Sequence, residues 1–193
     1  MSPPRLLPAI AALLALLLVQ GRASAGDTEA AWAALRQGGH VALMRHATAP
    51  GTGDPPGFRL EDCATQRNLS PLGRSEAEVL GEAFRGRDIA VDGVYSSQWC
   101  RCLETARLLG LGDVVPLPAL NSFFETPERE GPQMAALEAR LREQPPRGAV
   151  VLVTHQVVIT ALTAIFPMSG EVVVARPAVD GGLDVVGRIP PHR

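Results

Sequence analysis

Short apolar segments alternate with helix-like segments along this chain, and this alternation constrains the fold more than any other feature. Strands are expected at residues 40–46, 89–97 and 149–155, around Val114, and at a terminal pair, 171–175 and 183–189, joined by Gly181-Gly182. Helices are expected from the cap Ser70 and Pro71 through Phe84, and at residues 98–109, 130–143 and 157–166. The alternation predicts an α/β fold, a three-layer α/β/α sandwich with a mostly parallel sheet.

The length and the charge of the chain restrict its class. Its 193 residues suffice for one domain with a buried core. The formal charge is −2, and all 18 basic side chains are arginines scattered along the sequence. A nucleic-acid binder needs a clustered basic face, so this distribution argues against a nucleic-acid partner.

Residues 1–25 have the organisation of an export signal peptide. Arg5 precedes an apolar run at residues 6–19, and Ala23-Ser24-Ala25 places small residues where a signal peptidase reads the chain. We predict cleavage after Ala25, which leaves one domain of residues 26–193 in the periplasm or outside the cell, without stable membrane insertion. An uncleaved anchor is the alternative, although the apolar run is short for a membrane span.

Export would place the three cysteines, Cys63, Cys100 and Cys102, in an oxidising compartment. Cys100 and Cys102 lie two apart on an expected helix and therefore point to different sides, which makes them poor partners for each other. We expect a disulfide between Cys63 and either Cys100 or Cys102; three unpaired thiols are the alternative. A zinc site is disfavoured because no second Cys/His cluster has ligand spacing.

Three expected strands end on polar, reactive residues. These ends are Arg45-His46, Ser96-Ser97 with Arg101 one helical turn further on, and Thr154-His155. The carboxyl ends of parallel strands meet at one edge of a sheet, where α/β proteins bind their ligands. Two histidines and two arginines would converge there, as phosphoryl transfer through a phosphohistidine requires: an imidazole attacks phosphorus while guanidinium groups hold the phosphoryl oxygens.

Four motifs carry a resemblance to a known family. They are Leu43-Met44-Arg45-His46-Ala47, Arg67-Asn68-Leu69-Ser70 with Gly73, Ser96-Ser97 with Arg101 and Thr105-Ala106, and Val153-Thr154-His155. Together and in this order they resemble the histidine phosphatase superfamily, whose fold is phosphoglycerate mutase-like. The resemblance implies that His46 is the nucleophile, that Arg45, Arg101 and His155 bind the phosphoryl group, and that no metal or other cofactor is required. Thr48 is a further candidate for phosphate binding, or else a loop cap.

The chain departs from the family pattern at three positions. Ala47 replaces the usual Gly after the nucleophile, and Gln156 replaces the common Gly after the second histidine, where its side chain could narrow the pocket. Ser122 follows Leu120-Asn121 where many members carry the acidic residue that protonates the leaving group. Glu125 is our candidate for that general acid, and Glu128 is a second nearby carboxylate; both could instead be solvated loop residues.

The sequence thus favours a metal-independent phosphomonoesterase that acts on a small phosphorylated substrate. Small exported members of the family resemble phosphatases that act on lipopolysaccharide core heptose phosphate, which suggests an envelope sugar phosphate as substrate. A binding module with weak or no turnover, and a phosphohistidine or phosphoprotein phosphatase, are the alternatives. A cysteine phosphatase is excluded, because the positions six residues after the three cysteines hold Leu69, Ala106 and Leu108 rather than Arg.

Overall fold

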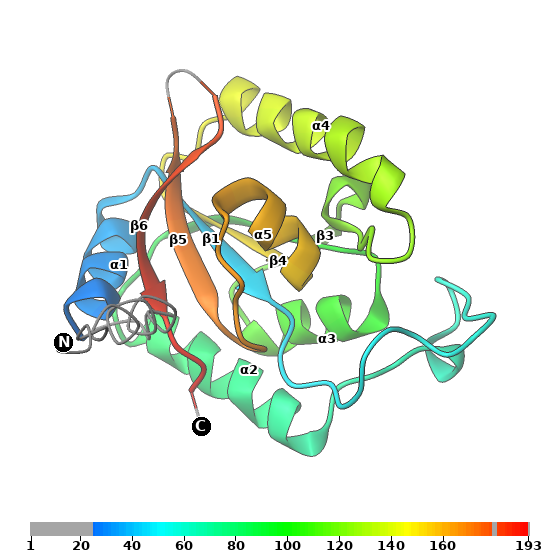
Figure 1. The fold of residues 1–193 in the computed structure, drawn as a ribbon. Helices are drawn as coiled ribbons and strands as arrows, with labels where there is room; N and C mark the ends of the chain where they lie inside the picture. The colour runs from blue at the N-terminus through cyan, green and yellow to red at the C-terminus, as the bar shows by residue number, and fades with distance from the viewer. Residues whose placement is uncertain (1–24, 179–180, 193) are drawn as a thin grey trace, which may run out of the picture.

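The computed structural model describes residues 25–178 and 181–192, and they form one six-stranded sheet between helices (Figure 1). The strands are β1 (His40–Arg45), β2 (Val91–Ser96), β3 (Val114–Pro116), β4 (Ala149–Thr154), β5 (Val172–Pro177) and β6 (Leu183–Ile189). The helices are α1 (Ala25–Gln37), α2 (Pro71–Arg85), α3 (Cys100–Leu109), α4 (Glu130–Glu143) and α5 (Gln156–Thr163). Three single-turn 3₁₀ helices, η1 (Cys63–Thr65), η2 (Pro118–Leu120) and η3 (Pro127–Arg129), lie in the connections.

The sheet is parallel in its first part and antiparallel at its end. Its strand order is β3-β2-β4-β1-β5-β6, with parallel pairing from β3 to β1 and antiparallel pairing for β5 and β6. Helices α1, α2 and α3 cover one face, through a core that includes Trp32, Phe84 and Leu109. Helices α4 and α5 cover the other face, through Leu137 and Ile159. The expected three-layer sandwich with a mostly parallel sheet is therefore confirmed.

The register of the central strands brings their carboxyl ends together. Arg45, the last residue of β1, lies opposite Thr154 at the end of β4, and Ser96 of β2 pairs with Val153 of the same strand. The residues that follow, His46, Ser97 and His155, therefore leave the sheet at one edge.

Helix α2 begins as its sequence predicts. The Ser70 hydroxyl accepts the Gly73 N–H at 3.0 Å, and Pro71 occupies the first helical position, where no intrahelical partner is required. Gly73 has a second reason to lack a side chain, because a Cβ there would come within 2.2 Å of the Thr48 carbonyl oxygen. The start of α2 is thereby packed directly against the segment that follows His46.

Several expected boundaries need correction. The first helix, α1, was not anticipated, although Trp32 and Leu35 bury one side of it against β6 and the core. The last helix ends at Thr163 rather than at residue 166, because Ala164 adopts a left-handed conformation that terminates it. The predicted signal peptide lies outside the described residues except for Ala25. Within residues 25–178 and 181–192, no helix is long and apolar enough to cross a membrane.

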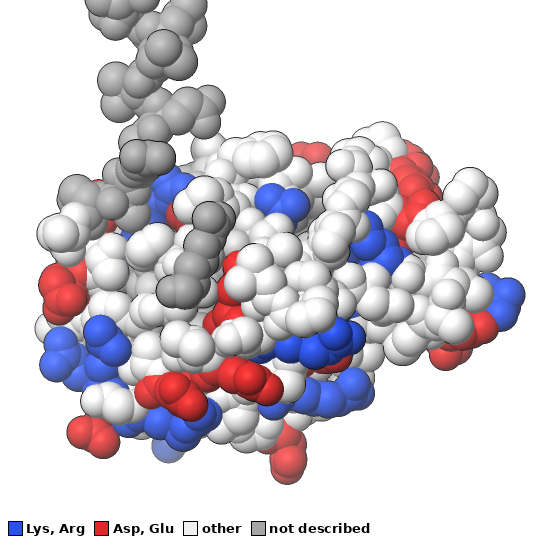
Figure 2. Space-filling model, turned by 90° about the horizontal axis from the view of Figure 1, so that it is seen from below, with Lys and Arg blue, Asp and Glu red and all other residues white. Residues whose placement is uncertain are grey.

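Charged residues on the face seen in Figure 2 are mixed in sign. Basic side chains there alternate with acidic ones, and neither sign covers a continuous area of that face.

Candidate active site

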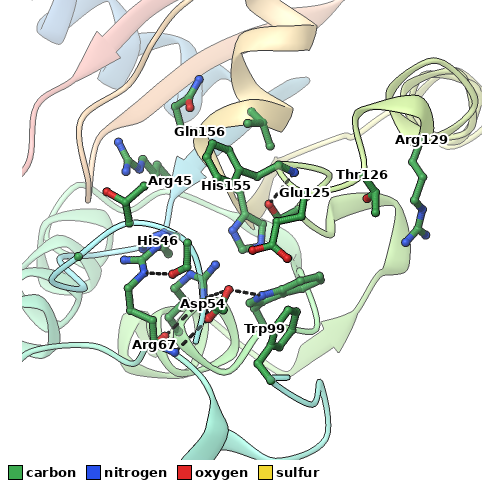
Figure 3. Close-up of a pocket in the computed structure, with 18 residues that line it drawn as sticks. Arg45, His46, Asp54, Arg67, Trp99, Glu125, Thr126, Arg129, His155 and Gln156 are labelled. Carbon is green, nitrogen blue, oxygen red and sulfur yellow. Dashed lines mark hydrogen bonds and ion pairs between the residues drawn. The ribbon is translucent and has the colours of Figure 1, made fainter. Parts of the chain in front are cut away.

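A cavity of about 300 Å³ opens at the carboxyl edge of the sheet, where the sequence analysis expected the site. The four predicted residues Arg45, His46, Arg101 and His155 all line it and make up the pocket floor. Figure 3 shows Arg45, His46 and His155 together there. Its walls come from two loops, residues 51–58 after β1 and residues 122–126 after η2, and from the first turn of α5. The tertiary structure thus brings the strand-end residues into one pocket with space for a small ligand.

The imidazole of His46 is held in one tautomer. It is 2% exposed, and its Nδ1 lies 2.8 Å from the Ala47 carbonyl oxygen. A carbonyl oxygen only accepts, so Nδ1 carries the proton and Nε2 keeps its lone pair. Burial and the neighbouring charge of Arg101 lower the pKa of His46 to about 3, so the ring is neutral at neutral pH. A neutral imidazole with a free Nε2 has the form required of a nucleophile.

His155 lies beside His46 and is anchored by Ser97 and Cys102, which belong to the segment that begins with Ser96-Ser97. Its Nε2 is 2.8 Å from the Ser97 hydroxyl and 3.5 Å from the Cys102 sulfur. Burial lowers the pKa of His155 well below its ordinary value, and the charge of Arg101 lowers it further. The Trp99 ring stands edge to face against His155, with centroids 5.2 Å apart, and fixes the ring from another side.

Two guanidinium groups of the pocket have unsatisfied donors. The Nε–H groups of Arg45 and Arg101 are buried without a hydrogen-bond partner among the described residues. Arg45 is positioned by Nη1, which donates to the Pro167 carbonyl at 2.9 Å. Buried donors are normally satisfied, so two orphaned N–H groups on one pocket floor indicate a site for an anionic ligand.

Three charged residues of the pocket, Asp54, Arg67 and Arg129, are not among the predicted site residues. Asp54 lies on the loop after β1 and forms an ion pair with Arg101, with an Nη1–Oδ1 distance of 2.8 Å. Arg67 donates from Nε to the Gly53 carbonyl at 2.8 Å and from Nη1 to the Ala49 carbonyl at 2.5 Å. Arg67 belongs to the Arg67-Asn68-Leu69-Ser70 motif and could have been identified from it, whereas no pattern in the sequence indicates Asp54.

A disulfide attaches this loop region to α3. Cys63 is bonded to Cys100, the first residue of the helix, and Cys102 is free and buried. Burial raises the pKa of the Cys102 thiol to about 12, so it stays protonated. Beside the disulfide, the Cys100 N–H donates to Gln66 Oε1 at 3.0 Å. Of the two pairings left open, the structure selects Cys63 with Cys100.

Of the remaining predicted residues, the structure places Glu125 in the pocket and Thr48 outside it. Glu125 lines the cavity, with its carboxylate directed towards the pocket centre (Figure 3). Both carboxylates are on exposed residues, but Glu128, on η3, does not line the cavity. The Thr48 hydroxyl donates to Glu76 at 3.0 Å, and the Thr48 N–H bonds the same carboxylate. Thr48 as a phosphate ligand is therefore corrected: buried Glu76 uses its donors, and Thr48 tethers the loop to α2.

The two other departures from the family pattern also have definite positions. Gln156 lines the pocket, and its amide donates to the Thr160 hydroxyl at 2.8 Å. Ala47 is fully buried, and its N–H donates to the Thr105 hydroxyl at 3.1 Å.

Among the described residues there is no group of three or more His, Cys, Asp or Glu side chains arranged to hold a metal ion.

Comparison with known proteins agrees with the geometry. A family model described as the histidine phosphatase superfamily (branch 1) matches residues 41–126, which include Arg45, His46 and Arg101. This match confirms the resemblance to that superfamily over the segment it covers. A comparison with curated proteins gave no match.

Solved structures share the fold at low sequence identity. The protein histidine phosphatase SixA, complexed with tungstate, aligns with a TM-score of 0.59 and 18% identity over 79% of this chain and 97% of that one. A mycobacterial glucosyl-3-phosphoglycerate phosphatase aligns with a TM-score of 0.55 and 19% identity over 77% and 98% of the two chains. A phosphoserine phosphatase from Entamoeba histolytica aligns with a TM-score of 0.53 and 15% identity over 77% and 95%.

Proposed function

We propose that this protein hydrolyses phosphomonoesters through a phosphohistidine on His46. The observation that carries the proposal is the pocket floor: a neutral His46 with a free Nε2 lies beside two guanidinium groups whose buried Nε–H donors have no partner. A phosphoryl group supplies the acceptor oxygens that these donors lack, and it presents phosphorus to the imidazole.

The proposed reaction has two displacements. In the first, His46 Nε2 forms a bond to phosphorus, the ester P–O bond breaks, and the leaving oxygen takes a proton from Glu125. In the second, water attacks the phosphohistidine and gives its proton to the Glu125 carboxylate. The P–N bond then breaks, which returns His46 to its neutral form and leaves inorganic phosphate. Arg45 and Arg101 neutralise charge on the phosphoryl oxygens in both steps.

The position of Glu125 favours an enzyme over a binding module. A module without turnover would need only the phosphate site, whereas this chain also places a carboxylate in the pocket across from the Asp54 loop. A phosphohistidine or phosphoprotein phosphatase uses a different leaving group and would not depend on Glu125. The dependence of turnover on Glu125 therefore separates these alternatives.

We further propose that the protein acts outside the cytoplasm, with an envelope sugar phosphate as its substrate. The leader-like sequence of residues 1–25 and the disulfide between Cys63 and Cys100 support export, because disulfides persist in oxidising compartments. Phosphorelays are cytoplasmic, which makes the phosphohistidine phosphatase alternative less consistent with this location.

The proposal is tested by p-nitrophenyl phosphate hydrolysis with purified residues 26–193 in EDTA, beside His46→Ala. We expect release of p-nitrophenol in EDTA, and we expect the substitution to abolish it. Circular dichroism checks that His46→Ala is folded. Full activity in His46→Ala would rule out the phosphohistidine mechanism. Release that EDTA abolishes would rule out metal independence, and phosphate binding without any release would favour the binding module.

A further inference from the structure

The carboxylate of Asp54 is enclosed by hydrogen-bond donors. Oδ1 accepts from the Arg67 N–H at 3.0 Å and from Arg101 Nη1 at 2.8 Å. Oδ2 accepts from the Trp99 indole N–H at 3.0 Å and, at 3.1 Å, from the same Arg101 nitrogen. The side chain is only 6% exposed. Every contact is one in which Asp54 accepts, so the site suits an ionised carboxylate and no neutral group of the same size.

The contact with Asp54 occupies one nitrogen of Arg101 and leaves another free. A guanidinium is planar, and its Nε–H and Nη2 form an edge on the side away from Nη1. Both Asp54 oxygens bind Nη1, while the buried Nε–H is among the unsatisfied donors of the pocket. Fixing Nη1 therefore fixes the plane and the direction of the open edge.

We propose that Asp54 is a positioning residue that aims the Nε edge of Arg101 at the phosphoryl site. This inference rests on the proposed function, since the edge matters because it binds the phosphoryl oxygens. Asp54 acts through Arg101 and does not touch the reacting atoms. Without it, a long arginine side chain would have to be ordered as the phosphoryl group transfers, and that ordering would raise the free energy of the transition state.

Asp54 does not take the part of general acid. Burial raises the pKa of its carboxyl, but the hydrogen bond and charge of Arg101, with the hydrogen bonds of Arg67 and Trp99, hold it below its ordinary value. The group is thus ionised at neutral pH and has no proton to donate. This leaves the acid role to Glu125 and gives the two pocket carboxylates separate tasks.

The loop that carries Asp54 is itself fixed to the body of the protein. Arg67 bonds the Gly53 and Ala49 carbonyls, and the disulfide from Cys63 to Cys100 holds the neighbouring segment at the start of α3. Arg101 is the next residue of that helix. The loop that carries Asp54 and the helix that carries Arg101 are therefore joined by a covalent bond at Cys100, one residue before Arg101.

A double-mutant cycle tests the inference. The four proteins are wild type, Asp54→Asn, Arg101→Gln and the double variant, assayed with p-nitrophenyl phosphate. We expect Asp54→Asn to lower kcat about tenfold with less than about threefold change in KM. In the Arg101→Gln background the same substitution should lower kcat less than about twofold, because the group it positions is gone. A tenfold loss in both backgrounds, or no loss in either, contradicts the inference.

Controls separate positioning from folding. Asp62→Asn makes the same chemical change in the same connection, where Asp62 pairs with exposed Arg59, and should keep wild-type kcat. Near-ultraviolet circular dichroism and thermal unfolding identify the folded variants. If Asp54→Asn does not fold, Asp54→Glu replaces it, since it keeps the charge and displaces the carboxylate by one methylene. The same non-additivity with Arg101→Gln is then expected.

The cycle also distinguishes failure of this inference from failure of the proposed function. If the wild type turns over no phosphomonoester, the four proteins are titrated with inorganic phosphate by calorimetry. Coupling between positions 54 and 101 in phosphate affinity would support positioning even though hydrolysis had failed. Independent effects on affinity would overturn positioning alone, and no phosphate binding by the wild type would overturn both.

Discussion

His46 and His155 stand edge to face in the pocket, with their ring centroids 5.7 Å apart and their planes inclined by 69°. Burial lowers the pKa of both imidazoles, and the charge of Arg101 lowers them further. Two neutral rings can lie this close beside guanidinium groups, whereas two imidazolium ions would repel each other and the arginines. The arrangement places two uncharged imidazoles beside the positive charges of Arg45 and Arg101.

The histidine pair predicts that acid weakens the fold. The pKa of His46 is about 3 in the folded state, against an ordinary value of 6.5, and that of His155 is also lowered. Below pH 6.5 these two histidines bind protons in the unfolded chain but not in the folded chain. The free energy of unfolding therefore falls as the pH falls towards 3. Each histidine contributes a slope of up to about 1.4 kcal/mol per pH unit.

Urea unfolding at pH 7 and pH 5 in phosphate-free buffer measures this effect. Between pH 7 and pH 5, the free energy of unfolding should fall by about 2 kcal/mol less in His46→Asn than in the wild type, because asparagine does not titrate. An equal loss in both proteins would show that folding does not lower the pKa of His46.

Arg101→Ala should lower kcat/KM for p-nitrophenyl phosphate about a hundredfold or more, through lost stabilisation of the transferring phosphoryl group. The variant should also lower the melting temperature, because Asp54 would remain buried as an unpaired charge. Steady-state kinetics and thermal unfolding check the two effects. Arg107→Ala, at an exposed position on the same helix, is the matched control and should change neither.

Glu125→Gln should slow the hydrolysis of an alkyl phosphate about a hundredfold, since the alkoxide leaving group needs a proton. The loss should be smaller for p-nitrophenyl phosphate, whose leaving group is stable as an anion. Comparison of kcat for the two substrates measures the difference. Glu128→Gln, three residues away and exposed, should retain wild-type rates on both. Equal losses on both substrates would assign Glu125 to binding rather than to proton transfer.

Removal of the disulfide should destabilise the protein more than it changes the chemistry. Cys63 and Cys100 are separated by 37 positions, and a loop of this length corresponds to about 4 kcal/mol in the chain-entropy description. Cys63→Ser/Cys100→Ser should therefore show a clearly lower denaturant midpoint than the wild type. Titration of the unfolded, unreduced wild type should find one thiol, that of Cys102; three thiols would exclude the disulfide.

The strand-end residues could be predicted because their positions depend on local rules. A short apolar run that ends on Arg45-His46 or Thr154-His155 specifies both a buried strand and the residue at its carboxyl end, and parallel pairing places such ends at one edge. The long-range register only had to align them, and Arg45 does lie opposite Thr154. This is why four residues of the pocket floor could be inferred from pattern alone.

The remaining parts of the site were decided by tertiary contacts. The choice of Cys100 over Cys102 depends on the rotation of α3, which turns Cys100 towards the loop and Cys102 towards His155. Asp54 lies in a connection rich in glycine and proline, where no periodicity fixes the direction of a side chain. Its contact with Arg101 occurs in a loop that Arg67 and the disulfide attach to the rest of the fold. The strands and the reactive residues at their ends can be read from the amino-acid sequence, since both follow from local periodicity. The pairing of Asp54 with Arg101 cannot, because it depends on contacts between residues far apart in the chain.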